Sequence, residues 1–522
     1  MLAASSTSRP KVLVPEDHLI WRRTTVEGRP VVYGVGGSDG PPVVFLHGWA
    51  LGSHAYKRAI RRLANRGCRV FAPALPSFGD TANLPATSMN IAGYAQWVAA
   101  FMEAVGINEP ALVIGHSFGG GVAIKLAHDN PHLVRYLILL NALGGGSKRF
   151  PWEWAIGFGN ECWPPTGIIG MVQAMRSDLV PNLLRNPFGI FRVGLLALIT
   201  DLRQELLDLK ELGVPVLVLT SERDRLIPRS AFETVCDAVG AEGRVVSGGH
   251  AWLLVDPDSF DEVLASTIDV QVAEHEASRS ADRRTEIELL LDHSNLTKRE
   301  IHQLLDVSAP LWLLSESAAT LAGDLVLCRP RIKKNEVRAL ARNIDGSNSY
   351  RLTIAARDRP GLLADSAAVL TESGLSISNA SASTWLKPKV ALHAFIVDSG
   401  PEMSSEAWDG LGERLREMVA TGKAPRPAIG PLRPVIVSAQ GIGEQLMVKV
   451  TAPDETGLLS TICRFFHTHG LNIETLRARA EDGTANAAML VVGNVDPTDL
   501  KEALVDWLIG TQTPERNFSL VR

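Results

Sequence analysis

Residues 111–130, ALVIGHSFGGGVAIKLAHDN, are the stretch that decides the expected fold of the first half of the chain. An apolar run leads into Gly-His-Ser-Phe-Gly, and apolar residues at helical spacing follow. This order predicts a strand, a sharp turn and a helix, with Ser117 at the tip as in a nucleophile elbow. Gly115, Gly119, Gly120 and Gly121 suit the close approach of strand and helix, because glycine has no Cβ. A glycine-rich turn that cradles a phosphate is the alternative interpretation.

The segments around this turn alternate between predicted strands and helices. Such alternation predicts an α/β domain with a doubly wound, mostly parallel sheet. We expect an antiparallel pair at 20–25 and 31–34, strands at 43–46, 69–73, 112–114, 136–140, 214–220 and 244–246, and a helix at 91–105.

Two further polar residues follow strand ends at the edge of the sheet that carries Ser117. Asp224 follows the strand at 214–220, and His250 follows the strand at 244–246. A serine becomes a good nucleophile only when an imidazole takes its proton, and the imidazole needs a carboxylate to fix its tautomer. The order therefore predicts Ser117 as nucleophile, His250 as base and Asp224 as the orienting acid. Glu222 is a rival acid.

The strand at 43–46 ends in His-Gly-Trp, which suggests an oxyanion hole. The backbone N–H of Trp49 can pair with that of Phe118, and two such donors stabilise the oxygen of a tetrahedral intermediate. A simple turn at the end of the strand is the alternative.

Residues 144–212 interrupt the alternation of strands and helices. They contain Trp152, Trp154 and Trp163 and long apolar helical patterns such as 191–209. We interpret them as a lid that forms an apolar pocket, with ordinary helical packing around core tryptophans as the alternative.

The composition narrows the class of protein. A length of 522 residues suggests three or four domains, and 46% hydrophobic and 21% charged residues are typical of a globular chain. The net charge is −5, so the chain has no surplus of basic residues that would favour binding to nucleic acid or to an anionic membrane surface. Five scattered cysteines favour a reducing compartment without structural zinc. The sequence contains no apolar run of 18 residues, so we expect no membrane span. Residues 1–10 lack the core of a signal peptide, so a cytoplasmic location is expected.

Several motifs of residues 17–270 together resemble the α/β-hydrolase fold superfamily. The resemblance implies the roles given above, a small-molecule substrate and no cofactor. The superfamily includes esterases, lipases, amidases, C–C bond hydrolases, lyases and cofactor-free haloperoxidases, whereas its epoxide hydrolases and dehalogenases use aspartate in place of Ser117. The matching motifs are FLHGWALGS at 45–53, LPSFGD at 75–80, IGHSFGGGVAIKLA at 114–127, SERDRLIP at 221–228 and GGHAWLLVDPDSF at 248–260.

A connector at 271–345 is expected after this domain, which we place at 1–270. Residues 274–285 are charged and poor in apolar side chains, which predicts a linker or a solvated helix. Residues 297–300 have the spacing of a capping box before a helix at 301–307, and further helices are expected after Pro310 and at 316–327.

The rest of the chain contains an internal repeat. ARDRPGLLADSAAVLTESGLSISNASA at 356–382 aligns with APDETGLLSTICRFFHTHGLNIETLRA at 452–478, at an offset of 96 residues (452−356). Each copy predicts a ferredoxin-like βαββαβ unit, at 346–438 and 443–522. The strands are expected at 350–355, 377–383 and 390–397 and at 446–451, 473–480 and 487–492, helices at 406–419 and 500–509, and closing strands at 435–437 and 518–521.

The motif D-x-x-G-L-L, at 358–363 and 454–459, resembles that of ACT domains, which bind amino acids or other small effectors. The amides of a helix N-terminus would hold a carboxylate. The resemblance implies effector binding by Asp358, Gly361, Asp454, Gly457 and Asn472. The first copy has Ser376 where the second has Asn472, which favours an effector in one copy. A pair of domains that only forms a homodimer is the alternative.

The connector and the repeat together resemble the C-terminal part of the nitrogen-sensing uridylyltransferase/uridylyl-removing family. Residues 271–522 contain no adjacent His-Asp pair, so the tail would have the sensory parts of that family without its catalytic ones. The sequence thus predicts a serine hydrolase tuned by an amino acid. A non-enzymatic sensor, and a cofactor-free haloperoxidase or lyase, are the alternatives.

Overall fold

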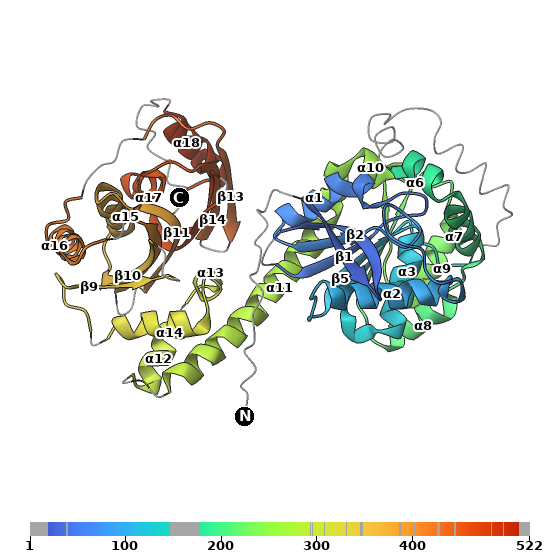
Figure 1. Ribbon diagram of the computed structural model, residues 1–522, viewed down its shortest axis with the longest axis horizontal. Coiled ribbons are helices and arrows are strands. Elements are labelled where there is room, and N and C mark those ends of the chain that lie inside the picture. The colour runs from blue at the N-terminus through green and yellow to red at the C-terminus, as the bar shows by residue number, and fades with distance from the viewer. Residues whose placement is uncertain are drawn as a thin grey trace. The chain divides into compact units, whose positions relative to one another are not determined.

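The computed structural model describes residues 19–510, apart from 38–39, 147–177, 293, 295, 307, 330, 345–347, 386–388, 401–402, 425–428, 443–444, 482 and 494. The chain divides into two compact units, Met1–His275 and Glu276–Arg522 (Figure 1). The division falls within the long helix α11 (Pro257–Leu291). This helix includes the charged stretch at 274–285, which is therefore helical.

The first unit is built on an eight-stranded sheet of order β1-β2-β4-β3-β5-β6-β7-β8. β1 pairs antiparallel with β2, and β2 pairs antiparallel with β4. All other neighbours are parallel, which confirms the mostly parallel sheet. The strands are β1 (Ile20–Val26), β2 (Arg29–Gly36), β3 (Pro42–Leu46), β4 (Arg69–Pro73), β5 (Ala111–His116), β6 (Val134–Leu140), β7 (Val216–Ser221) and β8 (Arg244–Val246).

Helices cover both faces of this sheet (Figure 1). Successive side chains of a strand point to opposite faces, so Val44 and Leu46 join one apolar core while Val43 and Phe45 join another. A parallel sheet buried on both faces explains why these strands are apolar throughout. α2 (Ile91–Ala104), α3 (Phe118–Asp129), α8 (Arg203–Glu211) and α9 (Arg229–Val239) pack on the first core, and α1 (Lys57–Asn65), α10 (Trp252–Val255) and the start of α11 pack on the second.

The expected lid lies partly outside the described residues, since 147–177, with its three tryptophans, is not described. The rest forms α6 (Val180–Arg185), α7 (Pro187–Ile199) and α8. The prediction of one long helix at 191–209 is wrong, because the backbone of Thr200 is extended and Asp201 accepts a hydrogen bond from the amide of Arg203 at the start of α8.

The second unit is built on an antiparallel sheet of order β13-β14-β16-β15-β11-β12-β10-β9. Each copy of the repeat supplies four neighbouring strands, and β11 joins the copies by pairing with β15. The strands are β9 (Val337–Asn343), β10 (Ser349–Arg357), β11 (Ser376–Trp385), β12 (Val390–Asp398), β13 (Ile436–Ile442), β14 (Gln445–Pro453), β15 (Asn472–Glu481) and β16 (Thr484–Val492).

The strand predicted at 435–437 does not close the first copy of the repeat, as expected, but belongs to the second copy. β13 pairs with β14 in register from Ile436 with Thr451 to Ile442 with Gln445, so it begins the second copy as a hairpin. β9 pairs with β10 in the same way. Each described copy is therefore ββαββα instead of βαββαβ, because a short antiparallel connection replaces a long return to the sheet. The other closing strand, at 518–521, lies outside the described residues.

Helices also cover both faces of the second sheet. Ile354 and Ala356 face the repeat helices, whereas Ala355 faces the connector. The rings of Trp312 and Trp385 meet edge to face there, with centroids 5.3 Å apart. The repeat helices are α15 (Leu362–Glu372), α16 (Ser405–Thr421), α17 (Leu458–Thr468) and α18 (Pro497–Ile509), and the connector helices are α12 (Lys298–Leu305), α13 (Pro310–Leu313) and α14 (Ala318–Leu327).

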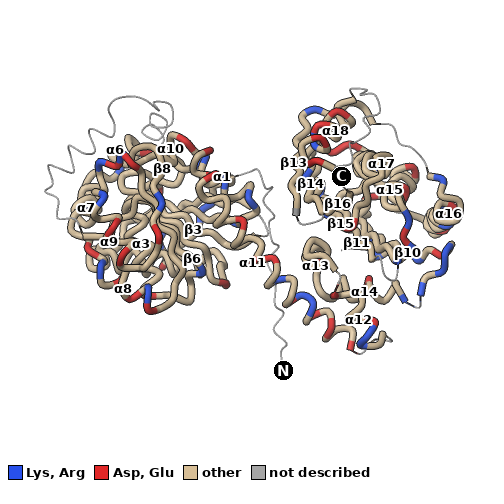
Figure 2. The backbone as a smooth tube through the Cα atoms, turned by 180° about the vertical axis from the view of Figure 1, so that it is seen from behind, with Lys and Arg blue, Asp and Glu red and all other residues tan. Residues whose placement is uncertain are grey.

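The capping box of Thr297 and Glu300 is present at the start of α12, as predicted. Basic and acidic segments are interspersed over the described part of each unit (Figure 2). No helix in the described part of the chain is both long and apolar enough to span a membrane.

Candidate functional site

Ser117 lies in the turn between β5 and α3 with φ of 54° and ψ of −116°. A positive φ is strained for a residue with a side chain and persists only where neighbouring structure enforces it. The Ser117 amide donates to the carbonyl of Leu140 at 3.0 Å. The Ser117 carbonyl accepts from the amides of Gly120 and Leu143, at 3.0 and 3.1 Å. The strand β6 and the following loop thus hold the strained turn.

Three of the four predicted glycines are required by close approach. A Cβ on Gly115 would lie 2.5 Å from the carbonyl oxygen of Gly119. A Cβ on Gly119 would lie 2.3 Å from the carbonyl oxygen of Leu46, and one on Gly120 would lie 2.4 Å from Cβ of Ala142. Gly121 is different, because its nearest neighbour would be 3.5 Å away, an ordinary contact. The prediction that close approach requires Gly121 is therefore wrong.

The structure brings Asp224 and His250 together. Nδ1 of His250 lies 2.9 Å from Oδ2 of Asp224, and their side chains are only 8% and 2% exposed. Oδ1 of Asp224 accepts hydrogen bonds from the amides of Leu226 and Ile227, at 2.8 and 2.9 Å. Burial would raise the pKa of Asp224, but His250, the amide of Ile227 and the side chain of Asn141 hold that pKa below its ordinary value. Asp224 is therefore ionised at neutral pH, and its pairing with Nδ1 leaves Nε2 of His250 for proton transfer.

Asn141 directly follows β6 and contacts the Asp224 carboxylate, although the sequence reasoning gave it no role because it is not an acid. Its Nδ2 donates to Oδ2 of Asp224 at 2.6 Å and to Oγ of Ser221 at 2.8 Å. Its Oδ1 accepts from Nε1 of Trp252 at 2.9 Å. Asn141 thus orients the carboxylate that orients His250. Its position directly after a strand, at the same edge of the sheet as Ser117, was the feature of the sequence that could have indicated this contact.

The rival acid Glu222 is not part of this arrangement. Its side chain is 50% exposed and lies 3.5 Å from Arg223.

The two predicted oxyanion donors flank Ser117. Phe118 is the first residue of α3, and the first amides of a helix have no acceptor within the helix. A Cβ on Gly48 would lie 3.3 Å from Cβ of Ser117, which places the turn that carries Trp49 beside the serine. Nε1 of Trp49 donates to the carbonyl of Ile190 in α7 at 2.8 Å. The helix α7 therefore anchors the loop that would present the Trp49 amide.

His47 fixes the start of the same loop. Its Nε2 accepts from the amide of Leu75 at 2.8 Å, so its Nδ1 carries the proton and donates to the carbonyl of Gly48 at 2.8 Å. Burial lowers the pKa of His47 to about 4, so the ring is neutral.

A small cavity of about 20 Å³ lies beside the Asp224 loop. It is bounded by the loop after β6, the end of α7, and Leu226 and Ile227. Among the described residues, no three His, Cys, Asp or Glu side chains gather as metal ligands.

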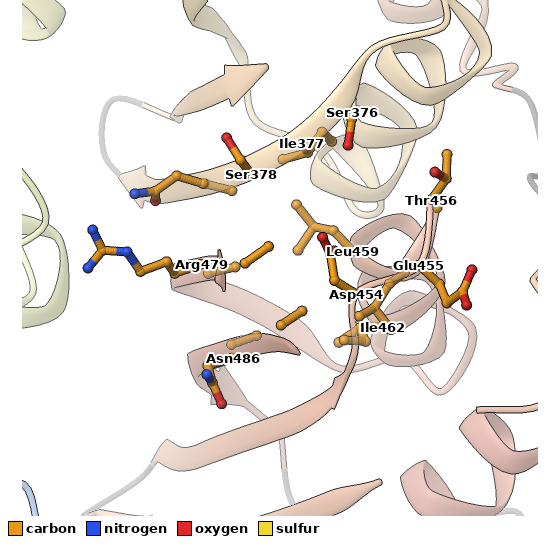
Figure 3. A pocket seen from close by; sticks show the side chains of 18 of the residues that line it. Ser376, Ile377, Ser378, Asp454, Glu455, Thr456, Leu459, Ile462, Arg479 and Asn486 are labelled. Carbon is orange, nitrogen blue, oxygen red and sulfur yellow. The ribbon is translucent and has the colours of Figure 1, made fainter. Parts of the chain in front are cut away.

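A larger cavity, of about 140 Å³, lies between the two copies of the repeat (Figure 3). Ser376, Ile377 and Ser378 of the first copy form one side. Residues 454–459 of the second copy, with Arg479 and Asn486, form the other. Burial raises the pKa of Asp454, and the charge of Glu455 adds to this effect. Of the predicted effector residues, Asp454 and Gly457 line this cavity.

Asp358, Gly361 and Asn472 do not line it. By the repeat, the counterpart of Thr371, which lines the cavity, is His467 (371+96). The His467 ring lies against Gly361, where a Cβ would be 2.9 Å from Cδ2 of the ring. The two copies thus differ, and effector binding at these residues stays a prediction.

Comparison with known proteins identifies the fold of the first unit. Residues 41–156 match the model of the family described as alpha/beta hydrolase fold. A protein of Mycobacterium phage D29, provisionally named a non-heme haloperoxidase, is 26% identical over 252 residues, which are 43% of this chain and 87% of that protein. Together with the mostly parallel sheet, these matches show that the N-terminal half has the α/β-hydrolase fold.

Two enzymes match over a shorter stretch. The soluble epoxide hydrolase of Corynebacterium sp. (strain C12) is 34% identical over 120 residues, 23% of this chain and 41% of that enzyme. The non-heme chloroperoxidase of Streptomyces lividans is 36% identical over 122 residues, 23% of this chain and 44% of that enzyme. The chain thus spans less than half the length of either enzyme.

Proposed function

We propose that the chain is a serine hydrolase that cleaves an ester, amide or related acyl substrate through an acyl-Ser117 intermediate. One observation carries this proposal: a buried Asp224–His250 pair lies at the end of the sheet where Ser117 occupies a strained turn. The fold of the first unit and its hydrolase relatives support a hydrolytic enzyme.

The mechanism follows from the roles of these groups. Oγ of Ser117 attacks the substrate carbonyl carbon while Nε2 of His250 takes the hydroxyl proton. The amides of Trp49 and Phe118 donate to the oxygen that becomes negative. His250 then gives the proton to the leaving group, and the acyl group stays on Ser117. A water molecule attacks the acyl carbon with His250 again as base, which releases the acid and restores the serine.

Labelling with a fluorophosphonate probe, together with hydrolysis of p-nitrophenyl esters of increasing chain length, tests this proposal. We expect stoichiometric labelling of Ser117 in the full chain. The Ser117→Ala variant should lose labelling and at least about 10⁴-fold of turnover while keeping its fold. Ser460→Ala, which changes a buried serine in the second unit, is the matched control. Labelling or turnover that survives Ser117→Ala would show that the assignment is wrong.

A cofactor-free haloperoxidase that uses the same three residues is the second candidate. The haloperoxidase and chloroperoxidase among the similar proteins favour it. Halogenation of a chromogenic acceptor that requires peroxide and exceeds ester hydrolysis would support this candidate over the first.

We also propose that the cavity of the repeat binds an amino acid or a similar small effector that tunes the hydrolase. Arg479 supplies a cation, Asp454 and Glu455 supply anions, and Leu459 and Ile462 supply an apolar surface. This combination suits a zwitterion with an apolar side chain, since each charge can find an opposite partner. A repeat that only forms a homodimer and a non-enzymatic sensor are the alternatives.

Thermal shift of the full chain with each of the twenty amino acids tests the effector, and ester hydrolysis with and without them tests the coupling. We expect one chemical class to raise the melting temperature, and Arg479→Ala to abolish the shift. If no amino acid changes the melting temperature, a purely structural role of the repeat is favoured. Light scattering would then test whether the chain forms a homodimer. An effector response without fluorophosphonate labelling would favour the sensor.

A further inference from the structure

A chain of hydrogen bonds joins the oxyanion loop, the end of β5 and the His250 loop of the proposed active site. The amide of Gly48 lies 3.1 Å from the hydroxyl oxygen of Tyr56. The same hydroxyl lies 2.8 Å from Nδ1 of His116, and Nε2 of His116 lies 2.9 Å from the carbonyl oxygen of His250. Tyr56 and His116 are buried. The chain therefore runs from the oxyanion loop, through the residue before Ser117, to the backbone of the proposed base.

The chemistry of the partners fixes the direction of every bond. A carbonyl oxygen only accepts, so Nε2 of His116 carries a proton and donates to His250. Burial and the nearby His250 together lower the pKa of His116 to about 3, so the ring is neutral and Nδ1 has a lone pair. The Tyr56 hydroxyl must then donate to Nδ1, which leaves its oxygen to accept from Gly48. Only one arrangement of protons satisfies all these groups.

We propose that Tyr56 and His116 are positioning residues that hold the oxyanion loop and the His250 loop in register with Ser117. The inference rests on the proposed function. Gly48 directly precedes Trp49, whose amide would stabilise the oxyanion, and His116 directly precedes Ser117. The His116 and His250 rings also pack together, with centroids 4.9 Å apart. A shift of about 1 Å between such groups can cost about 100-fold in rate, so a rigid link between the loops matters for catalysis.

A phenylalanine at position 56 separates this role from ordinary packing. It would fill the same space against the ring of Phe45, 5.2 Å away, but would leave the Gly48 amide and Nδ1 of His116 buried without a partner. The loop would then move to find another acceptor, which displaces the Trp49 amide. Packing alone predicts a loss of stability, whereas positioning predicts a loss of rate.

The first test compares Tyr56→Phe with Tyr94→Phe in the full chain, with p-nitrophenyl butyrate as substrate. Tyr94 is also fully buried, and its hydroxyl donates to the carbonyl of Pro76 at 3.0 Å. We expect kcat of Tyr56→Phe to fall about 10- to 100-fold with KM within about twofold, because the missing contact matters most at the transition state. Tyr94→Phe should keep kcat within about threefold at a similar loss of melting temperature. Equal rates for both variants, or an unchanged kcat in Tyr56→Phe, would overturn the proposal.

The second test replaces His116. Glutamine presents one acceptor and one donor at a spacing close to that of the two ring nitrogens, so His116→Gln can keep both bonds. His116→Leu fills the space and keeps neither. We expect the glutamine variant to retain at least about ten times the kcat of the leucine variant, because it preserves the link. Equal activity of the two variants would contradict a positioning role.

A third measurement does not depend on activity. The nitrogen chemical shifts of His116, in protein labelled with ¹⁵N-histidine, report which ring nitrogen carries the proton. We expect the Nε2–H tautomer in the wild type and a changed Nδ1 resonance in Tyr56→Phe. An Nδ1–H tautomer, or no change on substitution, would refute the hydrogen-bond chain. If fluorophosphonate fails to label the wild type but the tautomer is as expected, the proposed function fails while the link between the loops stands.

Discussion

The Asp224 site and the cavity of the repeat both contain carboxylates, but Asp224 is buried whereas Asp454 and Glu455 are exposed, and the two sites hold them differently. The side chain of Asp224 has four hydrogen-bonding partners, which are His250, Asn141, Leu226 and Ile227. Within the described residues, no side-chain hydrogen bond fixes Asp454 or Arg479 in the cavity. Groups fixed in advance favour the stabilisation of a charge that develops during a reaction. Groups without fixed partners suit a ligand that brings its own.

The same substitution at both carboxylates gives the largest expected contrast. Asp224→Asn would turn an amide N–H₂ toward His250 or toward the amide donors of Leu226 and Ile227, and so favour the wrong tautomer of His250. We expect kcat for a p-nitrophenyl ester to fall about 10³- to 10⁴-fold. Asp454→Asn should leave the basal kcat within about twofold and change only the thermal response to an effector. A similar loss of basal kcat in both variants would erase the contrast.

Glycine substitutions extend the comparison to stability. A Cβ on Gly119 would meet the backbone oxygens of Leu46 and His47, at 2.3 and 2.6 Å, and neither oxygen can move without the strand. We expect Gly119→Ala to lower the free energy of unfolding by at least about 3 kcal/mol. Gly361 has φ of 79° and faces the side chain of His467, which can rotate, so Gly361→Ala should cost about 1–2 kcal/mol. Urea titrations of both variants measure this, and a larger loss for Gly361→Ala would contradict our account of the elbow.

Acidification should weaken the first unit more than the second. Burial lowers the pKa of His47 to about 4 and of His116 to about 3, both in the first unit, and of His393 to about 3 in the second. Between these values and the ordinary pKa of about 6.5, the unfolded state binds more protons than the folded state, so stability falls as pH falls. Each histidine contributes up to about 1.4 kcal/mol per pH unit.

Hydrogen-exchange mass spectrometry at pH 6.5 and 5.5, corrected for the intrinsic exchange rate, follows the opening of each unit separately. We expect the first unit to lose about twice as much opening free energy as the second. His116→Gln should remove most of that excess, since glutamine does not titrate and one depressed histidine would then remain in each unit. Equal losses in the two units would show that the buried histidines do not set the acid sensitivity.

The smallest expected effect concerns Glu222, a half-exposed carboxylate that lies beside Arg223. Its side chain is half exposed, and water screens its charge from His250. Glu222→Gln should change kcat for the ester by less than about twofold. A larger loss would mean that Glu222, two residues before Asp224, shares the role of the acid.

The site was predictable where the chemistry follows strand ends in the sequence. Ser117 directly follows β5, whereas Asp224 and His250 lie in the loops that follow β7 and β8, and the parallel sheet brings such ends to one edge. Asn141 stands in the same context, but an asparagine gives no sign of which carboxylate it will contact. The Tyr56–His116 contact joins residues on two separate elements, and neither residue stands in a motif that reveals its partner.

The fold was predictable to a similar extent. Strands buried on both faces are apolar throughout, so their positions were clear. β9 and β13 are edge strands with mixed sequences such as VRALARN and IVSAQGI, so only their hairpin partners show where they belong. The break between α7 and α8 depends on local hydrogen bonds at residues 200–203, which an apolar pattern does not reveal.

The pairing of β11 with β15 joins the two copies of the repeat into one continuous sheet within a single polypeptide. If the two copies were separate chains, their pairing would depend on concentration, but here they belong to one polypeptide that continues from α16 to β13, so they stay together at any dilution. The shared cavity between the copies therefore exists in every molecule, whether or not another molecule is nearby.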